Sequence, residues 1–384
     1  MINLKKITSL LLTVLLVTSI FTSVIYAEKD STELYKAAIE KTLYKAFEDG
    51  FSQYYKINDI SVKFDDVTIT DGKLEANVLA KMNKTLLAKS VEELPYVKGM
   101  LKKANMKDFK HESKAKTDEA VYKANKDKLS NDKIAYISKE IDFRLSYLEQ
   151  YINKPVNGNY YLKVTADVND GTLDTNSIRI LAENVDEYVP FDEMLPESEE
   201  QIEQEGLNDM QAVINSEDEG FKSSLYASYS RVDAVDYANM WTGVDVTDCD
   251  VHGTSCGIYQ DRAYWNTDTY PYYAELLHND CADFVSQCLN AGGIPMDSTW
   301  KRGATGTPAW VNVSSLKSYM VNKGYWTSAT ISTCLSGGVI FTSSSHVVMC
   351  VENDSITKYY TGHTNDRVYA PYTNPSGWVY YKLW

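Results

Sequence analysis

Apolar and polar positions in the first part of the chain follow a helical period and then a period of two. Residues 31–49 place apolar side chains at helical spacing after a Ser or Thr cap, and a glycine follows. Residues 60–64 and 74–78 alternate apolar and polar side chains, as strands with one buried face do. Asp71-Gly72 lies between these runs and is a favourable turn. The pattern predicts a helix followed by a β-hairpin.

The next hundred residues extend this pattern. Residues 85–130 are rich in lysine and weakly patterned, which indicates a helical or partly mobile stretch. Residues 133–152 place apolar side chains on one stripe of a helix, and residues 160–168 and 177–181 have the pattern of strands. Helices packed on a small antiparallel sheet make an α+β domain, which we expect over residues 28–194.

An acidic stretch separates this domain from the rest of the chain. Residues 186–220 carry many carboxylates and no Lys or Arg, and two prolines interrupt them. A run of like charges resists burial, so we expect a linker or a solvated edge, and we place an acidic linker at residues 195–222. An aromatic-rich C-terminal domain over residues 223–384 follows, and residues 231–241 within it have a helical pattern.

The N-terminus and the charge bear on where the protein acts. Lys5 and Lys6, the mainly apolar residues 7–25 and Ala27 follow the order of a secretory signal, so we expect a signal peptide over residues 1–27 and an exported protein. A retained anchor is the alternative. No later stretch approaches 18 uninterrupted apolar residues, so no other membrane span is expected. The net charge of −15 argues against nonspecific nucleic-acid binding and suits solubility or a wall-associated partner.

Residues 279–293 carry the pattern of a helix that begins at Cys281. Asp280 is a good N-cap, Asp283 is spaced as in a capping box, and two glycines end the segment. Apolar positions form one stripe that includes Cys281. A helix N-terminus favours the thiolate, which is the nucleophilic form of cysteine, although Asp280 opposes this. The alternative interpretation is a small buried hydrophobic side chain.

Two of the five histidines lie in a C-terminal run of strands. Residues 337–341, 346–351 and 356–361 have strand patterns, with His346 at the start of the second strand. A four-residue turn at residues 353–356 would place His363 opposite His346. A nucleophile, a base and a group that orients the base form a catalytic triad, so Cys281, His346 and His363 are candidates. Asn365 and Asp366 are the alternatives for the third position.

The cysteine spacing does not predict a metal centre. All six cysteines lie at or after Cys249, no C-x-x-C pair occurs, and the two-His, two-Cys spacing of a zinc site is missing. We expect no metal and no organic cofactor, with His252 as only a weak hint of a metal ligand. Cys249 and Cys256 flank a short polar loop, and both a disulfide and two free thiols fit their spacing.

Residues 223–384 resemble the putative amidase domain family, secreted proteins related to papain-like cell-wall peptidases and CHAP-type amidases. The resemblance is carried by Asp280-Cys281-Ala282-Asp283-Phe284-Val285-Ser286-Gln287, Ala291-Gly292-Gly293-Ile294-Pro295-Met296, Trp300, Trp310, His346-Val347-Val348 and Gly362-His363-Thr364-Asn365-Asp366. It implies a papain-like domain, in which a helix with the cysteine packs on an antiparallel sheet with the histidine. It also implies hydrolysis of an amide bond in peptidoglycan or a peptide, with Cys281 and His346 as the dyad.

Further expectations and two alternatives accompany this resemblance. An upstream tyrosine often supports the oxyanion site in such relatives, which makes Tyr272 a candidate together with Tyr270 and Tyr273. Trp300 and Trp310 fit either a substrate groove or core and rim packing. The alternative functions are an inactive wall-binding module and a thiol-dependent acyltransferase or transpeptidase.

Overall fold

The computed structural model describes residues 31–106, 108–216, 229–247, 249–250, 258–270, 279–303, 305–342 and 345–383. The expected signal peptide at residues 1–27 lies outside these ranges. Among the helices of the described residues, none is both long enough and apolar enough to cross a bilayer.

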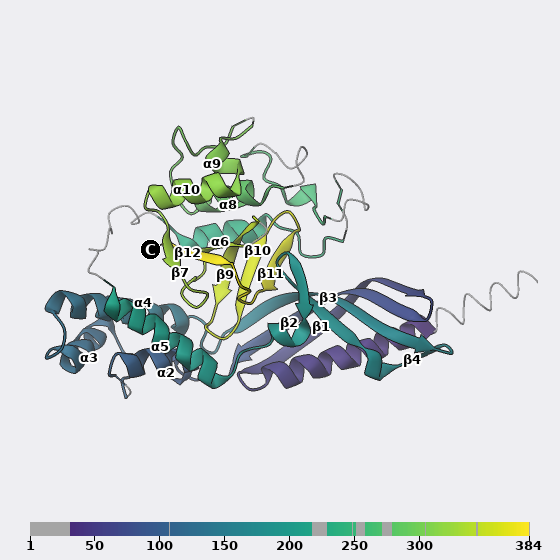
Figure 1. Cartoon of the computed structure of the whole chain (residues 1–384), viewed down its shortest axis with the longest axis horizontal. Helices are drawn as coiled ribbons and strands as arrows, with labels where there is room; N and C mark the ends of the chain where they lie inside the picture. Colours follow the sequence, from purple (N-terminus) through teal and green to yellow (C-terminus); the bar gives the residue numbers. More distant parts are fainter. Residues whose placement is uncertain are drawn as a thin grey trace, which may run out of the picture.

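The N-terminal half is a curved antiparallel sheet with a helix along it (Figure 1). The helix spans residues 31–51, as the pattern predicts. The strands pair in the order β1-β2-β3-β5-β6, with β4 on β3. Asp71 and Gly72 form the predicted turn with φ values of 51° and 72°. The strands are β1 (Tyr55–Thr70), β2 (Lys73–Leu86), β3 (Pro155–Asn169), β4 (Thr172–Leu173), β5 (Arg179–Asn184) and β6 (Glu187–Pro190).

The expected linker at residues 195–222 is wrong for most of its length, because residues 199–215 form helix α5 (Glu199–Asn215). Ser198 and Gln201 make a capping box at its start, and its inner face is buried. The helix packs on α2 (Pro95–Lys103) at Gly99 and Gly206, where an added Cβ would meet backbone oxygen at 1.9 Å. Glu199 and Glu200 at the helix start are exposed, whereas Asp209 is buried and accepts a hydrogen bond from Tyr96. Two further helices lie nearby, α3 (Lys114–Asn125) and α4 (Asn131–Glu149).

The C-terminal half is a second antiparallel sheet covered by helices on one face. Figure 1 shows α6 and α8 across the sheet, with α9 and α10 beyond α8. The strand order is β11-β10-β9-β8-β12-β7. The chain is therefore α+β with two sheets. The elements are α6 (Arg231–Met240), α8 (Cys281–Ala291), α9 (Pro308–Val311), α10 (Val313–Asn322), β7 (Thr327–Ala329), β8 (Val339–Phe341), β9 (Val347–Asn353), β10 (Lys358–Gly362), β11 (Arg367–Pro371) and β12 (Val379–Lys382).

The two halves share one apolar core and are joined by buried polar contacts. Arg367 on β11 pairs with Glu183 on β5 through two hydrogen bonds of 2.7 and 2.8 Å. Lys84 on β2 is fully buried, and its Nζ donates to Thr357 Oγ1 at 2.6 Å. A buried charge is stable only when it is paired or fully hydrogen-bonded. These contacts therefore hold the two sheets in one arrangement.

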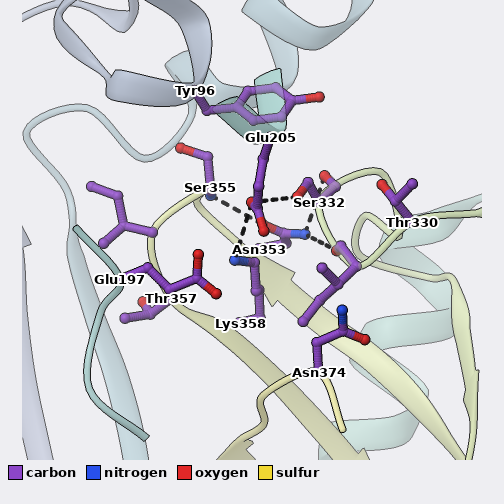
Figure 2. A network of polar contacts seen from close by, with 12 residues as sticks. Tyr96, Glu197, Glu205, Thr330, Ser332, Asn353, Ser355, Thr357, Lys358 and Asn374 are labelled. Atoms are coloured by element: carbon purple, nitrogen blue, oxygen red, sulfur yellow. Dashed lines mark hydrogen bonds and ion pairs between the residues drawn. The ribbon is translucent and has the colours of Figure 1, made fainter. Parts of the chain in front are cut away.

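Figure 2 shows a second polar connection, from α5 to the end of β9. Ser332 donates to Glu205 at 2.5 Å, and Lys358 lies 3.8 Å from the same carboxylate. Asn353 is fully buried, and its side-chain amide donates to the carbonyl groups of Ile331 at 3.0 Å and of Cys334 at 3.1 Å. The network ties the loop before β8 to helix α5, so the supposed linker is part of the scaffold.

We predict that Glu183→Gln lowers the free energy of unfolding by roughly 3 kcal/mol, because Arg367 would remain buried without a charged partner. Urea unfolding of the full chain measures this change. Glu203→Gln is the control: it removes an exposed pair with Lys102 at 2.8 Å, which contributes less than about 1 kcal/mol. Equal losses in the two variants would contradict the prediction.

Candidate active site

Cys281 is the first residue of helix α8, as the sequence predicts, and only 5% of its surface is exposed to solvent. The predicted stripe is buried against the sheet: Cys281, Phe284, Val285, Cys288 and Leu289. The predicted cap does not form. Asp280 stands at the N-cap position, but its side chain makes no capping hydrogen bond. Asp283 instead accepts hydrogen bonds from Trp310 Nε1 and from Gln287.

His346 meets Cys281 across the junction between helix and sheet. It lies in the turn between β8 and β9, one residue before β9 begins, and its side chain hydrogen-bonds the Cys281 side chain. Burial alone would lower the pKa of His346, but the Cys281 sulfur, Asp186 and Asp280 raise it to about 9. The backbone N–H of Thr342 donates to the carbonyl of His346 at 3.0 Å and closes this turn. The structure thus brings together the two residues expected to react.

Asp186, which sequence reasoning missed, lies beside His346. Its Oδ1 is 3.9 Å from His346 Nε2, and its Oδ2 accepts a hydrogen bond of 2.6 Å from Thr342 Oγ1. Asp186 belongs to the turn between β5 and β6 in the N-terminal half. The only sequence signal was an acidic residue beside a strand pattern far upstream, and nothing local links such a residue to a histidine in another sheet.

The expectation that His363 lies opposite His346 is wrong. The turn after β9 is four residues long but begins one residue later than expected, and a bulge follows at Tyr359 and Tyr360. The resulting register pairs Thr361 with Met349, and a shift of one residue sends a side chain to the other face.

His363 contacts the residue before the nucleophile instead. Its Nδ1 is 2.7 Å from Asp280 Oδ2, its Nε2 is 2.6 Å from the carbonyl of Trp241, and its ring stacks on Phe284 at 3.8 Å. Both ring nitrogens face acceptors, so both must carry a proton. Burial alone lowers the pKa of His363, but Asp280 and Asp366 raise it to about 9. His363 is therefore a buried cation that neutralises Asp280.

The two alternatives for the third position hold a neighbouring segment. Asn365 accepts a hydrogen bond of 3.1 Å from the backbone N–H of Tyr259, and Asp366 accepts one of 3.2 Å from Asp261. Burial raises the pKa of Asp366 to about 7, against the opposing effect of His363. Neither contact reaches the His346 ring, so neither residue is placed to orient it.

Residues 228–384 match the family described as "Putative amidase domain". The C-terminal half is thus similar to that family. The chain is 31% identical over 146 residues to the uncharacterized protein YjcM of Bacillus subtilis (strain 168). The aligned part is 37% of this chain and 31% of that relative, so the chain spans about a third of its length. No solved structure matches the chain.

The two tryptophans that were candidates for a substrate groove belong to the core of the C-terminal half. Trp300 and Trp310 are fully buried, with ring centroids 4.7 Å apart. Trp300 Nε1 donates to Ser286 at 3.1 Å, and Trp310 Nε1 donates to Asp283. Both indole rings are therefore hydrogen-bonded to side chains of α8. They do not line a substrate groove. Tyr272, the candidate for the oxyanion site, lies outside the described residues.

A small open pocket lies beside Asp280, the residue before the candidate nucleophile. Its lining includes Asp280, Asp283 and His363, together with aromatic side chains such as Trp241 and Tyr264. Over the described ranges, no group of three His, Cys, Asp or Glu side chains is placed to hold a metal ion. His252 and Cys256, the residues behind the weak metal hint and the disulfide alternative, lie outside these ranges.

We predict that His363→Gln removes a pH-dependent part of the stability. The pKa of about 9 in the folded chain lies above the value of ~6.5 for an unfolded histidine. The imidazolium therefore contributes its full stabilisation below pH ~6.5 and loses it as the pH rises through about 9. The difference in unfolding free energy between wild type and His363→Gln should shrink over this interval. A difference that does not change with pH would show that His363 is not charged.

Proposed function

We propose that this chain is an exported cysteine hydrolase of papain-like design that cleaves an amide bond with Cys281 as nucleophile and His346 as its acid and base. The observation that carries the proposal is the hydrogen bond between these two side chains at the start of helix α8. The amidase-family match of residues 228–384 supports the choice of an amide as the substrate bond.

The chemistry follows from the positions of the two groups. An imidazolium beside a sulfur stabilises the thiolate, and the thiolate attacks the amide carbonyl carbon. The negative charge moves to the carbonyl oxygen, where the backbone N–H of Cys281 at the helix start can donate to it.

His346 then completes the reaction in two proton transfers. It gives its proton to the leaving amine as the C–N bond breaks, which leaves an acyl group on the Cys281 sulfur. The neutral imidazole next takes a proton from water, and the resulting hydroxide releases the acid and restores the thiolate. No other reactant is needed beyond the amide and water.

The surroundings of Asp280 remove an objection to this mechanism. A carboxylate next to the nucleophile should disfavour a thiolate. The His363 cation binds Asp280 at 2.7 Å, while Gln260 and the backbone N–H of Thr364 each donate to it at 3.1 Å. These donors offset the negative charge of Asp280, so the positive charge of His346 is the stronger influence on the Cys281 sulfur.

The substrate and location remain part of the proposal. The leader-like residues 1–27 and the net charge of −15 favour a secreted protein that acts at a cell wall. Peptidoglycan or a peptide offers the amide bonds that such a protein would meet.

We predict that Cys281→Ala abolishes amide cleavage while the fold persists, because no other group replaces the sulfur. The full chain is incubated with purified peptidoglycan and a panel of peptides, and the products are identified by mass. Cys288→Ala is the matched control, since Cys288 lies on the same face of α8 two turns on and is fully buried. Its variant should retain turnover.

Two outcomes of this experiment separate the alternatives. Full activity in Cys281→Ala would refute the assignment of the nucleophile, and binding without cleavage by the wild type would indicate a wall-binding module. Transfer of the acyl group to an added amine, in place of release of free acid, would identify an acyltransferase or transpeptidase.

We also predict that an active-site-directed thiol reagent modifies Cys281 much faster than Cys288, Cys334 and Cys350. All four thiols are buried, but only Cys281 stands beside a protonated histidine. Mass mapping of the modified peptides over time measures the relative rates. Equal, slow modification of the four thiols would contradict an activated nucleophile.

A further inference from the structure

The turn between β5 and β6 reaches from the N-terminal sheet into the amidase domain. It brings the Asp186 carboxylate to 3.9 Å from Nε2 of His346, the ring that also interacts with the Cys281 side chain. Thr342 links the two sides: its hydroxyl donates to Asp186 at 2.6 Å and accepts from the backbone N–H of His346 at 3.4 Å. The carboxylate is thus held against the turn that carries the histidine.

The residues just before Asp186 anchor this turn to the C-terminal sheet. Glu183 makes the two-bond pair with buried Arg367. The side-chain amide of Asn184 donates to the Thr373 hydroxyl at 3.1 Å, and its side-chain oxygen accepts from the backbone N–H of Thr373 at 3.1 Å. Three consecutive residues, Glu183, Asn184 and Val185, are buried before the chain emerges at Asp186.

Val185 adopts a conformation that its side chain disfavours. Its φ is 60°, in the left-handed region, where a β-branched residue is a clear outlier. Its side chain is buried on the sheet face away from α8, in a cluster that includes Ile340 and Val348. Strain of this kind persists only where the surroundings impose it, and it is concentrated at functional sites. The strained turn is what directs Asp186 toward His346.

We propose that Asp186 is the positioning residue for His346, so that the N-terminal half completes the active site of the amidase domain. This inference rests on the proposed function of Cys281 and His346. It assigns a role to the N-terminal half, which the family match does not cover: the segment 228–384 carries the nucleophile and the base, but the carboxylate that orients the base comes from residue 186.

Other charged groups near His346 do not replace Asp186. Among the described residues, the charged groups that raise the pKa of His346 are Cys281, Asp186 and Asp280. Asp280 is bound by His363, Gln260 and Thr364. The Asp186 carboxylate, by contrast, lies within ion-pair distance of the His346 ring, at 3.9 Å. Its side chain is 30% exposed, so water screens the interaction and the effect should be moderate.

The test uses the full chain with Asp186→Asn, Asp186→Glu and the control Glu187→Gln, which removes an exposed carboxylate from the same turn. Two readouts need no substrate: the rate at which iodoacetamide alkylates Cys281 as a function of pH, and the titration of His346 by NMR. Thermal unfolding of each variant monitors its stability separately.

We predict that Asp186→Asn lowers the pKa of His346 by on the order of one pH unit, as expected for the loss of a partly screened charge about 4 Å away. Because the pKa of His346 is about 9 in the wild type, a fall of about one unit leaves the ring largely protonated at pH 6–7, and alkylation of Cys281 there should change little. The step in the alkylation profile that follows His346 should instead move to lower pH by about one unit. Asp186→Glu should restore most of this shift, and Glu187→Gln should match the wild type. A purely structural role would change stability without moving the pH profile.

The failure of this inference differs from the failure of the proposed function. A wild-type pH profile in Asp186→Asn, with rapid alkylation of Cys281 in both proteins, would overturn the role of Asp186 alone. Slow alkylation and an ordinary His346 titration in the wild type would overturn the dyad itself. If Asp186→Asn does not fold, Asp186→Ser provides a second uncharged variant with the same expected shift.

Discussion

A guanidinium can be buried only beside a carboxylate, and the pair between Arg367 and Glu183 meets this requirement across the two halves of the chain. The pair fixes β5 against β11, and the turn that follows β5 then has little freedom. Val185, directly before Asp186, is buried in a left-handed conformation. The Glu183–Arg367 pair and the buried Val185 together therefore limit where Asp186 can lie. The candidate site therefore depends on an interaction that is remote from its chemistry.

The same principle of paired charges organises the start of the nucleophile helix. Asp280 could either cap α8 or bind a cation. In the structure the Asp280 carboxylate bonds His363 and makes no capping hydrogen bond to α8. Two histidines thus have opposite tasks beside one cysteine. His346 faces the sulfur directly, while His363 neutralises the carboxylate that would otherwise oppose it.

Errors in prediction from sequence occurred where one residue of offset or one packing contact decides the outcome. The position of the turn after β9 and the bulge at Tyr359 and Tyr360 set the register, and neither is visible in an alternating pattern. Helix α5 lies in the stretch predicted to be a linker, because carboxylates dominate the composition of that stretch. Its amphipathic pattern indicates a packed helix only once the close approach of α2 at Gly99 and Gly206 is known.

The sequence by itself determined the local elements: the first helix and hairpin, the nucleophile helix with Cys281 in its first turn, and the strand that begins beside His346. These follow from periodicity, turn residues and short-range spacing, which neighbouring residues carry among themselves. Only the tertiary structure decided that Asp186 meets His346 and that His363 serves Asp280. Such contacts join residues from different sheets or from a sheet and a helix, and their pairing depends on register, buried charges and backbone strain that no local pattern records.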